Sequence, residues 1–346
     1  MEFREFQKTK RIAWVDNCKA FAISLVALGH MQSIYVVNEI IFSFAMPVFF
    51  FLSGYTFERS ANAPFVELLR KKFKSLIIPY VGFSAVLFVF WFFVRRNFGM
   101  SYQTDATVTD VLSQILCGVN SDFFVTPLWF LTCLFVTEIF FWSLLRLRKQ
   151  WVALSIILLL FVFGIYYWVY MDLRHFPHLF WNVDQTCFYL YFLAVGFMVS
   201  KRGIVEKLFC SLKRNIAVIL GLSVVFALSF VARENTLIVW QILLLQALMC
   251  NASLFAFVVI CKMIPENKVL NFVGQNTLVI LALHMMVQSV LRGILFKFFH
   301  MAPDGIESSL GLSGLLTLVT LAILVPVILL INRFVPWLAG KKVKSS

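Results

Sequence analysis

Ten apolar segments, each close to twenty residues long, recur along the chain and constrain its fold more than any other feature. A helix needs about 20 apolar residues to cross a bilayer, so each segment is long enough to span a membrane. Only 14% of the 346 residues are charged, against about 25% in an ordinary soluble domain. The sequence therefore predicts an all-α, polytopic transmembrane helix bundle. The predicted spans lie near residues 14–36, 39–57, 76–94, 127–145, 151–170, 184–199, 215–232, 237–261, 276–296 and 309–331.

The basic residues predict how the bundle is oriented. Most of the 30 Lys and Arg residues fall at the two ends of the chain and in every second connection between spans. Cytoplasmic segments collect Lys and Arg, so both termini are expected in the cytoplasm. The net charge of +13 then reflects topology and attraction to the lipid bilayer, and it requires no nucleic-acid partner. No connection is long enough for a separate soluble domain, so residues 1–346 are expected to form one integral-membrane domain.

Three ionisable residues in the first span mark a candidate site. Lys19 and His30 are eleven residues apart, which is three helical turns plus about 20°, and Asp16 falls on the same stripe. Ionisable groups at membrane depth cost about 2.5 to 3.5 kcal/mol each, so a line of three indicates function. His30 is the best candidate for a general base, because its imidazole titrates near neutral pH. The alternatives are that His30 bonds a neighbouring helix and that Lys19 only pairs with Asp16.

Four other polar or aromatic residues are candidates for the same site. Glu138 lies in the middle of its span, where it must pair or be protonated, and it could orient a histidine or meet Lys19. His284 is equally central in the ninth span and is a candidate for a role in a tunnel. Ser53 either permits close helix packing or contacts an acyl group or oxyanion, and Trp129 either lines the tunnel or packs in the core.

A basic cluster before the third span is expected to lie at the cytoplasmic surface. An amphipathic helix there places apolar residues on one side and Arg70, Lys71, Lys72 and Lys74 around the other. These cations either anchor the helix at the lipid interface or hold phosphates. A second interfacial helix, on the outer side, is expected to begin at a capping box formed by Thr107 and Asp110.

No metal or bound cofactor is expected from the sequence. The seven cysteines stand singly, and none forms a cluster with histidine at a spacing typical of metal ligands. Phosphate-binding loops of the G-x-x-x-x-G-K-[ST] type are also missing from the sequence. Any phosphate would therefore be held by point charges or helix ends.

Five sequence blocks together resemble the acyltransferase family 3 proteins, integral membrane enzymes that O-acylate sugars of cell-surface glycans. The blocks are WVDNCKAFAISLVALGH, FSFAMPVFFFLSGYTF, KKFKSLIIPY, PLWFL and VGQNTLVILALH. The resemblance implies that His30 is the essential histidine of an Arg-x10-His motif and that acyl-CoA is used from the cytoplasmic side. Lys19 stands where the better-known members have Arg, which keeps the charge but loses the bidentate fork. Ala45 stands where many relatives have histidine.

The expected function is therefore an O-acyltransferase, most simply an acetyltransferase, of the bacterial inner membrane. Lys19 lies about 16 Å along the helix from His30, a distance comparable with an extended pantetheine arm. Acyl-CoA is the expected co-substrate, with its phosphates near Lys19 and the basic cluster. The acceptor would be a sugar hydroxyl of a surface glycan or a polyprenyl-linked sugar. The rival interpretation is a transporter or flippase for such a lipid-linked sugar, and the sequence leaves open whether the chain forms a homo-oligomer.

Overall fold

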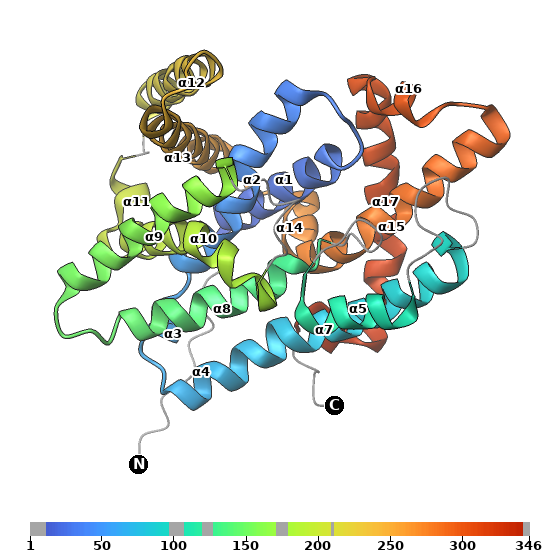
Figure 1. Cartoon of the computed structure of the whole chain (residues 1–346), viewed down its shortest axis with the longest axis horizontal. Coiled ribbons are helices and arrows are strands. Elements are labelled where there is room, and N and C mark those ends of the chain that lie inside the picture. Colours follow the sequence, from blue (N-terminus) through green and yellow to red (C-terminus); the bar gives the residue numbers. More distant parts are fainter. Residues whose placement is uncertain (1–11, 97–106, 120–126, 171–178, 209–210, 342–346) are drawn as a thin grey trace.

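The computed structural model describes residues 12–96, 107–119, 127–170, 179–208 and 211–341, and within these ranges all regular structure is helical (Figure 1). The first half of this part contains α1 (Ala13–Gly29), α2 (Tyr35–Tyr55), α3 (Glu58–Ala61), α4 (Phe65–Lys72), η1 (Phe73–Ile77), α5 (Ile78–Phe90), η2 (Trp91–Arg95), α7 (Val108–Cys117), α8 (Trp129–Leu144) and α9 (Gln150–Tyr170). The second half contains η3 (Phe180–Asn182), α10 (Val183–Arg202), α11 (Ile204–Leu208), α12 (Leu212–Glu234), α13 (Val239–Met263), α14 (Lys268–Gln275), α15 (Thr277–Phe299), α16 (Pro303–Glu307), α17 (Leu310–Phe334) and η4 (Pro336–Ala339).

The prediction of an all-α, polytopic bundle is confirmed, and each predicted span corresponds to a helix. Eight helical stretches of the described chain are long and apolar enough to cross a membrane. The other two predicted spans are shorter: α1 has 17 residues and α8 has 16. The prediction that the first span continues to residue 36 is wrong, because α1 ends at Gly29 and α2 begins at Tyr35.

The amphipathic helix before the third span is not a separate element. It continues through two π-helical turns, Phe73–Ile77 and Trp91–Arg95, to give one stretch of 31 residues from Phe65 to Arg95. Pro79 at the start of α5 has no N–H, and its ring would clash with a carbonyl four residues earlier in a regular helix. The wider π turn ends just before Pro79. It therefore lets the helix continue past this proline.

Two glycines bring α2 and α10 into backbone contact at the centre of the bundle. A Cβ atom on Gly54 of α2 would lie 1.9 Å from the carbonyl oxygen of Leu193, and one on Gly196 of α10 would lie 1.9 Å from that of Phe51. Each helix thus supplies the small residue that the other requires, as is common where membrane helices pack closely. The crossing fixes the position of Ser53, which precedes Gly54 and lies in the candidate site.

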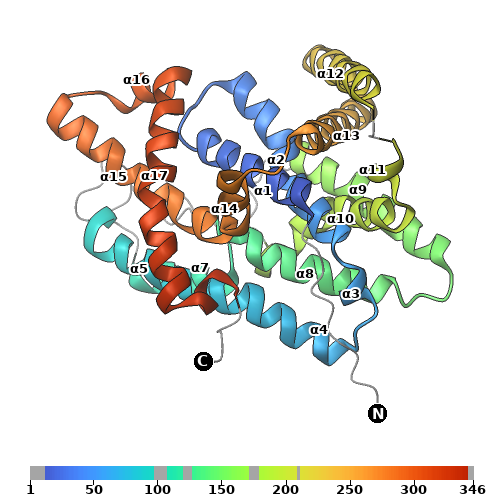
Figure 2. The same cartoon turned by 180° about the vertical axis from the view of Figure 1, so that it is seen from behind.

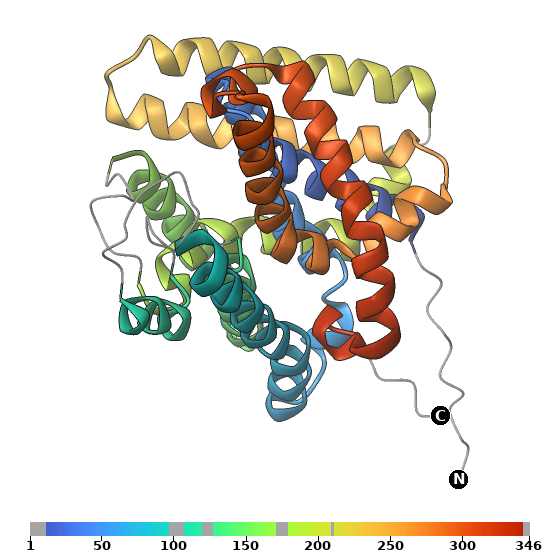
Figure 3. The same cartoon turned by 90° about the vertical axis from the view of Figure 1, so that its right-hand side faces the viewer.

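The helices around this crossing form three groups. The α12–α13 hairpin lies on one side of α1 and α2, and the run α4–α5 lies with α8 on the other (Figures 1 and 2). Seen from the side, α15 and α17 run across the bundle between these two groups (Figure 3). Helix α12 is the least enclosed of the membrane-crossing candidates, since only 11% of the residues in its apolar stretch are buried. The central helices α1, α2 and α8, together with α15, form the site, and α4, α9 and α10 contribute further residues to it.

The predicted capping box is confirmed at the start of α7. The Thr107 hydroxyl oxygen accepts a hydrogen bond from the Asp110 backbone N–H, and the Asp110 carboxylate accepts one from the Thr107 backbone N–H. Helix α7 contacts the long helix through Tyr80, whose hydroxyl donates to the carbonyl of Ile115. This short helix therefore braces the long helix near the start of α5.

Candidate active site

His30 directly follows the last residue of α1. Its backbone angles, φ −86° and ψ −10°, are still in the right-handed helical region, so the chain keeps its helical direction from Lys19 to His30. The ring of Phe42 on α2 lies 5.6 Å from the His30 ring, centroid to centroid. The same phenylalanine packs closely on Gly29, where a Cβ would approach it to 2.8 Å. His30 is therefore placed at a tight junction between α1 and α2.

Three side chains of α15, spaced four residues apart, face the end of α1. The His284 and His30 rings lie 5.4 Å apart. Gln288 Nε2 donates to the Ala27 carbonyl at 2.7 Å, and Arg292 Nη2 donates to the His30 carbonyl at 2.6 Å. The last carbonyls of a helix have no partner within it. Gln288 and Arg292 satisfy two carbonyls at this helix end and so hold His30 in place.

His284 is fully buried and has a defined hydrogen-bonding pattern. Its Nδ1 lies 2.9 Å from the carbonyl oxygen of Ile280, so Nδ1 carries the proton and donates it. The other ring nitrogen, Nε2, is then an acceptor. It is buried and makes no hydrogen bond within the described chain. A buried acceptor of this kind is costly unless something else engages it.

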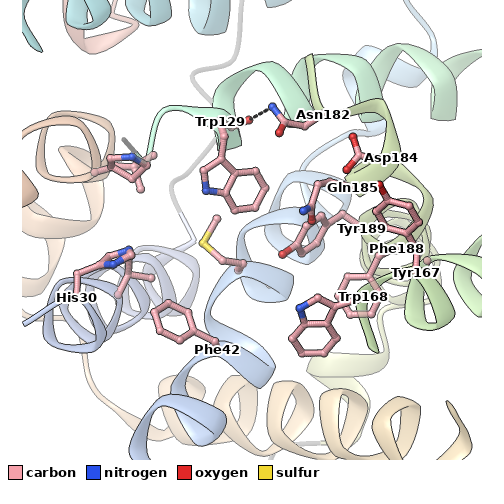
Figure 4. Close-up of a pocket in the computed structure, with 15 residues that line it drawn as sticks. His30, Phe42, Trp129, Tyr167, Trp168, Asn182, Asp184, Gln185, Phe188 and Tyr189 are labelled. Carbon is pink, nitrogen blue, oxygen red and sulfur yellow. Dashed lines mark hydrogen bonds between the residues drawn. The ribbon is translucent and has the colours of Figure 1, made fainter. Parts of the chain in front are cut away.

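A cavity of about 280 Å³ opens beside His30, and we call it the His30 cavity. His30 lies on one side of it, and an aromatic wall from α9 and α10 lies opposite (Figure 4). Asp184 and Gln185 add a carboxylate and an amide to that wall. The aromatic wall consists of Tyr167, Trp168, Phe188 and Tyr189, and Phe42 and Trp129 complete the aromatic lining. Aromatic faces with a few polar groups are typical of a binding site for a small molecule.

A second cavity of about 240 Å³, the Glu138 cavity, contains three of the charged candidates. Lys19, Ser53, Lys72 and Glu138 all line it. The Glu138 carboxylate is only 1% exposed, and its Oε1 accepts hydrogen bonds from Ser53 Oγ at 2.6 Å and from Lys72 Nζ. The other carboxylate oxygen, Oε2, is buried without a partner in the described chain. The cavity thus contains a buried carboxylate whose charge is balanced by Lys72 and whose Oε2 can still accept a hydrogen bond.

The two cavities follow one another along the same four helices. On α1 the Glu138 cavity meets Lys19 and Ile23, and the His30 cavity meets Val26 and His30. On α8, Trp129, the first residue of the helix, lines the His30 cavity. Glu138, two and a half turns further along, lines the Glu138 cavity. Leu281 of α15 lines both cavities. The arrangement is therefore an end-to-end row, with Leu281 in the wall at the junction.

The structure brings together only part of the predicted set. Lys72 turns into the Glu138 cavity, whereas its neighbours Arg70, Lys71 and Lys74 are exposed. Among the ion pairs of described residues, none joins Asp16 to Lys19. The buried partner of Glu138 is Lys72, which is neither the histidine nor the Lys19 that the sequence suggested.

Several site residues were missed by the sequence analysis. Gln288 and Arg292 had a usable signal, because H-x3-Q-x3-R places all three side chains on one face of a helix. Asp184 and Gln185 lie near the start of α10, and Trp168 near the end of α9. Nothing in their local sequence separates them from interfacial residues, so only the packing of α10 against α2 and of α9 against α10 reveals their position.

Comparison with known proteins identifies one family. A family model described as an acyltransferase domain, Acyl_transf_3, matches residues 12–331, which is nearly the whole chain. No curated protein and no solved structure matches the chain significantly. The match includes every residue of the two cavities.

Proposed function

The chain belongs to the acyltransferase 3 family and is a multi-pass membrane acyltransferase, and we propose that it is an O-acetyltransferase of the bacterial inner membrane. In this proposal it moves an acetyl group from acyl-CoA to a sugar hydroxyl of a surface or lipid-linked glycan. The observation that supports this most is the end-to-end row of two unlike cavities, one with an imidazole and one with a lysine–glutamate pair.

The Glu138 cavity is the proposed entrance for the donor. Lys19 supplies a cation in its wall, and Arg70, Lys71 and Lys74 are exposed on the helix that also carries Lys72. Acyl-CoA carries phosphates at one end and a thioester at the end of a flexible arm. The exposed cations would hold the phosphates, and the arm would pass Lys19 toward Leu281.

The His30 cavity is the proposed acceptor site. Sugar rings present apolar faces and polar edges, which the aromatic wall and the polar groups of Asp184 and Gln185 suit. His30 lies across the cavity from this wall (Figure 4). A sugar bound there would present a hydroxyl to the imidazole and would meet the thioester at the junction beside Leu281.

The proposed reaction is a direct transfer. The His30 imidazole takes the proton of the acceptor hydroxyl while that oxygen attacks the thioester carbonyl carbon. The carbon–sulfur bond then breaks, and the proton passes from His30 to the departing CoA thiolate, which leaves as the thiol. His284, 5.4 Å away ring to ring, would stabilise the transient imidazolium and act as a positioning residue. The apolar walls would exclude water, which otherwise competes for the acyl group.

Mass spectrometry of surface glycans from cells with and without the gene tests this proposal. The expected result is the loss of an acetyl mass from an otherwise intact glycan. Loss of the whole glycan would contradict the proposal and favour a transporter. Purified protein supplied with acetyl-CoA and the sugar that loses its acetyl group should then release CoA and form the acetylated sugar.

A further inference from the structure

A third cavity, of about 110 Å³, lies between the end of the long helix and α15, and we call it the arginine cavity. Arg95 and Trp91 line it from η2, and Ser289 and Arg292 line it from α15. Its other lining residues are Leu87, Phe90, Pro127, Ala282, Met285 and Met286. The lining therefore contains two guanidinium groups in apolar surroundings, and no lining residue is acidic.

The positive charge of this cavity is poorly compensated. No hydrogen bond or ion pair joins the Arg95 guanidinium to the described part of the chain. Arg292 is partly used, since Nη1 lies 3.5 Å from Glu307 and Nη2 donates to the His30 carbonyl. Its Nε is buried and has no partner among described residues. An arginine without a partner in apolar surroundings is costly, so Arg95, together with the partly used Arg292, indicates a site for an anion.

The arginine cavity adjoins the His30 cavity. Pro127 lines both, and Ala282 in one is next to Leu281 in the other. Arg292 also touches the His30 backbone directly. An anion held by Arg95 and Arg292 would thus lie beside the site proposed for the acceptor hydroxyl, on the side away from the Glu138 cavity.

We infer that the arginine cavity binds the phosphate group of a lipid-linked sugar acceptor. This inference rests on the proposed function and specifies its acceptor. Arginine forks match phosphate oxygens in charge and geometry. The apolar lining and the exposed Phe92 and Phe93, which belong to η2 like Arg95, suit a hydrocarbon chain attached to that phosphate. In an acceptor whose sugar is joined to lipid through phosphate, the sugar would lie in the His30 cavity and the phosphate in the arginine cavity. The lipid would lie along the apolar surface that includes Phe92 and Phe93.

The first test compares two acceptors with the same sugar, one attached to a lipid diphosphate and one a neutral alkyl glycoside. For wild-type protein, Arg95→Gln and Arg95→Lys, kcat/KM is measured for each acceptor with acetyl-CoA. Arg95→Gln should lower the preference for the diphosphate acceptor at least about 10-fold, which corresponds to about 1.4 kcal/mol. Arg95→Lys should retain part of the preference. The control Arg96→Gln, at an exposed neighbouring arginine outside the cavity, should not alter it.

The second test needs no transfer, so it separates this inference from the proposed function. A short-chain prenyl diphosphate should raise the thermal unfolding midpoint of wild-type protein and of Arg96→Gln, but not of Arg95→Gln. Equal losses of kcat/KM with both acceptors, or equal stabilisation of wild type and Arg95→Gln, would overturn the inference. Loss of copurified anionic phospholipid from Arg95→Gln with an unchanged acceptor preference would assign the arginines to bilayer headgroups instead, and would overturn it too.

Discussion

The ring of His30 lies 5.4 Å from the ring of His284, although the two residues belong to the first and the ninth predicted spans. His284 is fixed by its bond to Ile280 and is fully buried, whereas His30 reaches the cavity. The two histidines are therefore not equivalent. His30 is the group that a substrate can meet, and His284 is the group behind it.

This difference predicts the behaviour of His30→Gln. Glutamine keeps hydrogen-bonding capacity but cannot take up a proton, so the variant should insert normally and lose transfer at least about 100-fold. CoA release by purified protein measures the rate, and the thermal unfolding midpoint checks the fold. His300→Asn is the matched control, because His300 is exposed and its left-handed conformation, φ +53°, is one that asparagine tolerates. Wild-type rates from His30→Gln would exclude His30 as the base.

Gln288 is expected to position His30 through its hydrogen bond to the end of α1. Gln288→Leu leaves the Ala27 carbonyl without this partner, which should lower the free energy of unfolding by about 1 kcal/mol. It should also lower kcat several-fold with little change in the KM for acyl-CoA, because it loosens the end of α1 beside His30. Gln241→Leu is the control: it removes a glutamine hydrogen bond, to Thr236, near the start of α13 and outside both cavities. If the two variants lose stability equally and keep the same kcat, Gln288 has only a structural role.

The Lys72–Glu138 ion pair predicts an asymmetry in stability. The Glu138 side chain is 1% exposed and that of Lys72 is 15% exposed. Lys72→Met therefore strands a deeply buried carboxylate, and breaking such a pair costs about 3 to 5 kcal/mol. Glu138→Gln leaves a lysine that reaches solvent more easily and should cost less. Thermal unfolding of both variants and of the double variant tests this, with exposed Lys71→Met expected to be neutral. A milder loss for Lys72→Met than for Glu138→Gln would contradict the argument.

The orientation of the long helix gives a topology prediction. Phe65–Arg95 is 31 residues long, so Lys71 and Arg96 lie near opposite membrane surfaces. With both termini in the cytoplasm, Lys71→Cys should react with an impermeant thiol reagent only from the cytoplasmic side, and Arg96→Cys only from outside. The exposed Cys117 is replaced by serine beforehand. External labelling at position 71 would reverse the predicted orientation.

The sequence predicted features that lie within one helix and missed those that join helices. Span length follows from apolar runs, and the Lys19–His30 stripe follows from helical periodicity, so both could be read directly. The Lys72–Glu138 pair and the Arg292–His30 bond join residues 66 and 262 positions apart. They depend on how apolar helices pack, and this packing depends on close backbone approaches at small residues, such as that of Gly54 to Leu193. A uniformly apolar surface does not specify its neighbours, so these partners could not be foreseen.

Lys19 offers a prediction that separates donor binding from structure. It lines the Glu138 cavity, and no ion pair of the described residues joins it to Asp16. Lys19→Ala should raise the KM for acetyl-CoA about 10-fold, and Lys19→Arg should retain most of the affinity because the charge persists. The control Lys268→Ala removes an exposed lysine elsewhere.

A truncated thioester donor, S-acetyl-N-acetylcysteamine, makes the Lys19 test specific. It lacks the CoA phosphates, so an effect of Lys19 on phosphate binding should disappear with it, whereas damage to the fold or to His30 would persist. Steady-state kinetics with both donors gives the comparison. If the double variant Asp16→Asn/Lys19→Ala transferred from acetyl-CoA at the wild-type rate, Lys19 would serve only to balance Asp16. The distance of about 16 Å between Lys19 and His30 would then have no relation to the length of the pantetheine arm.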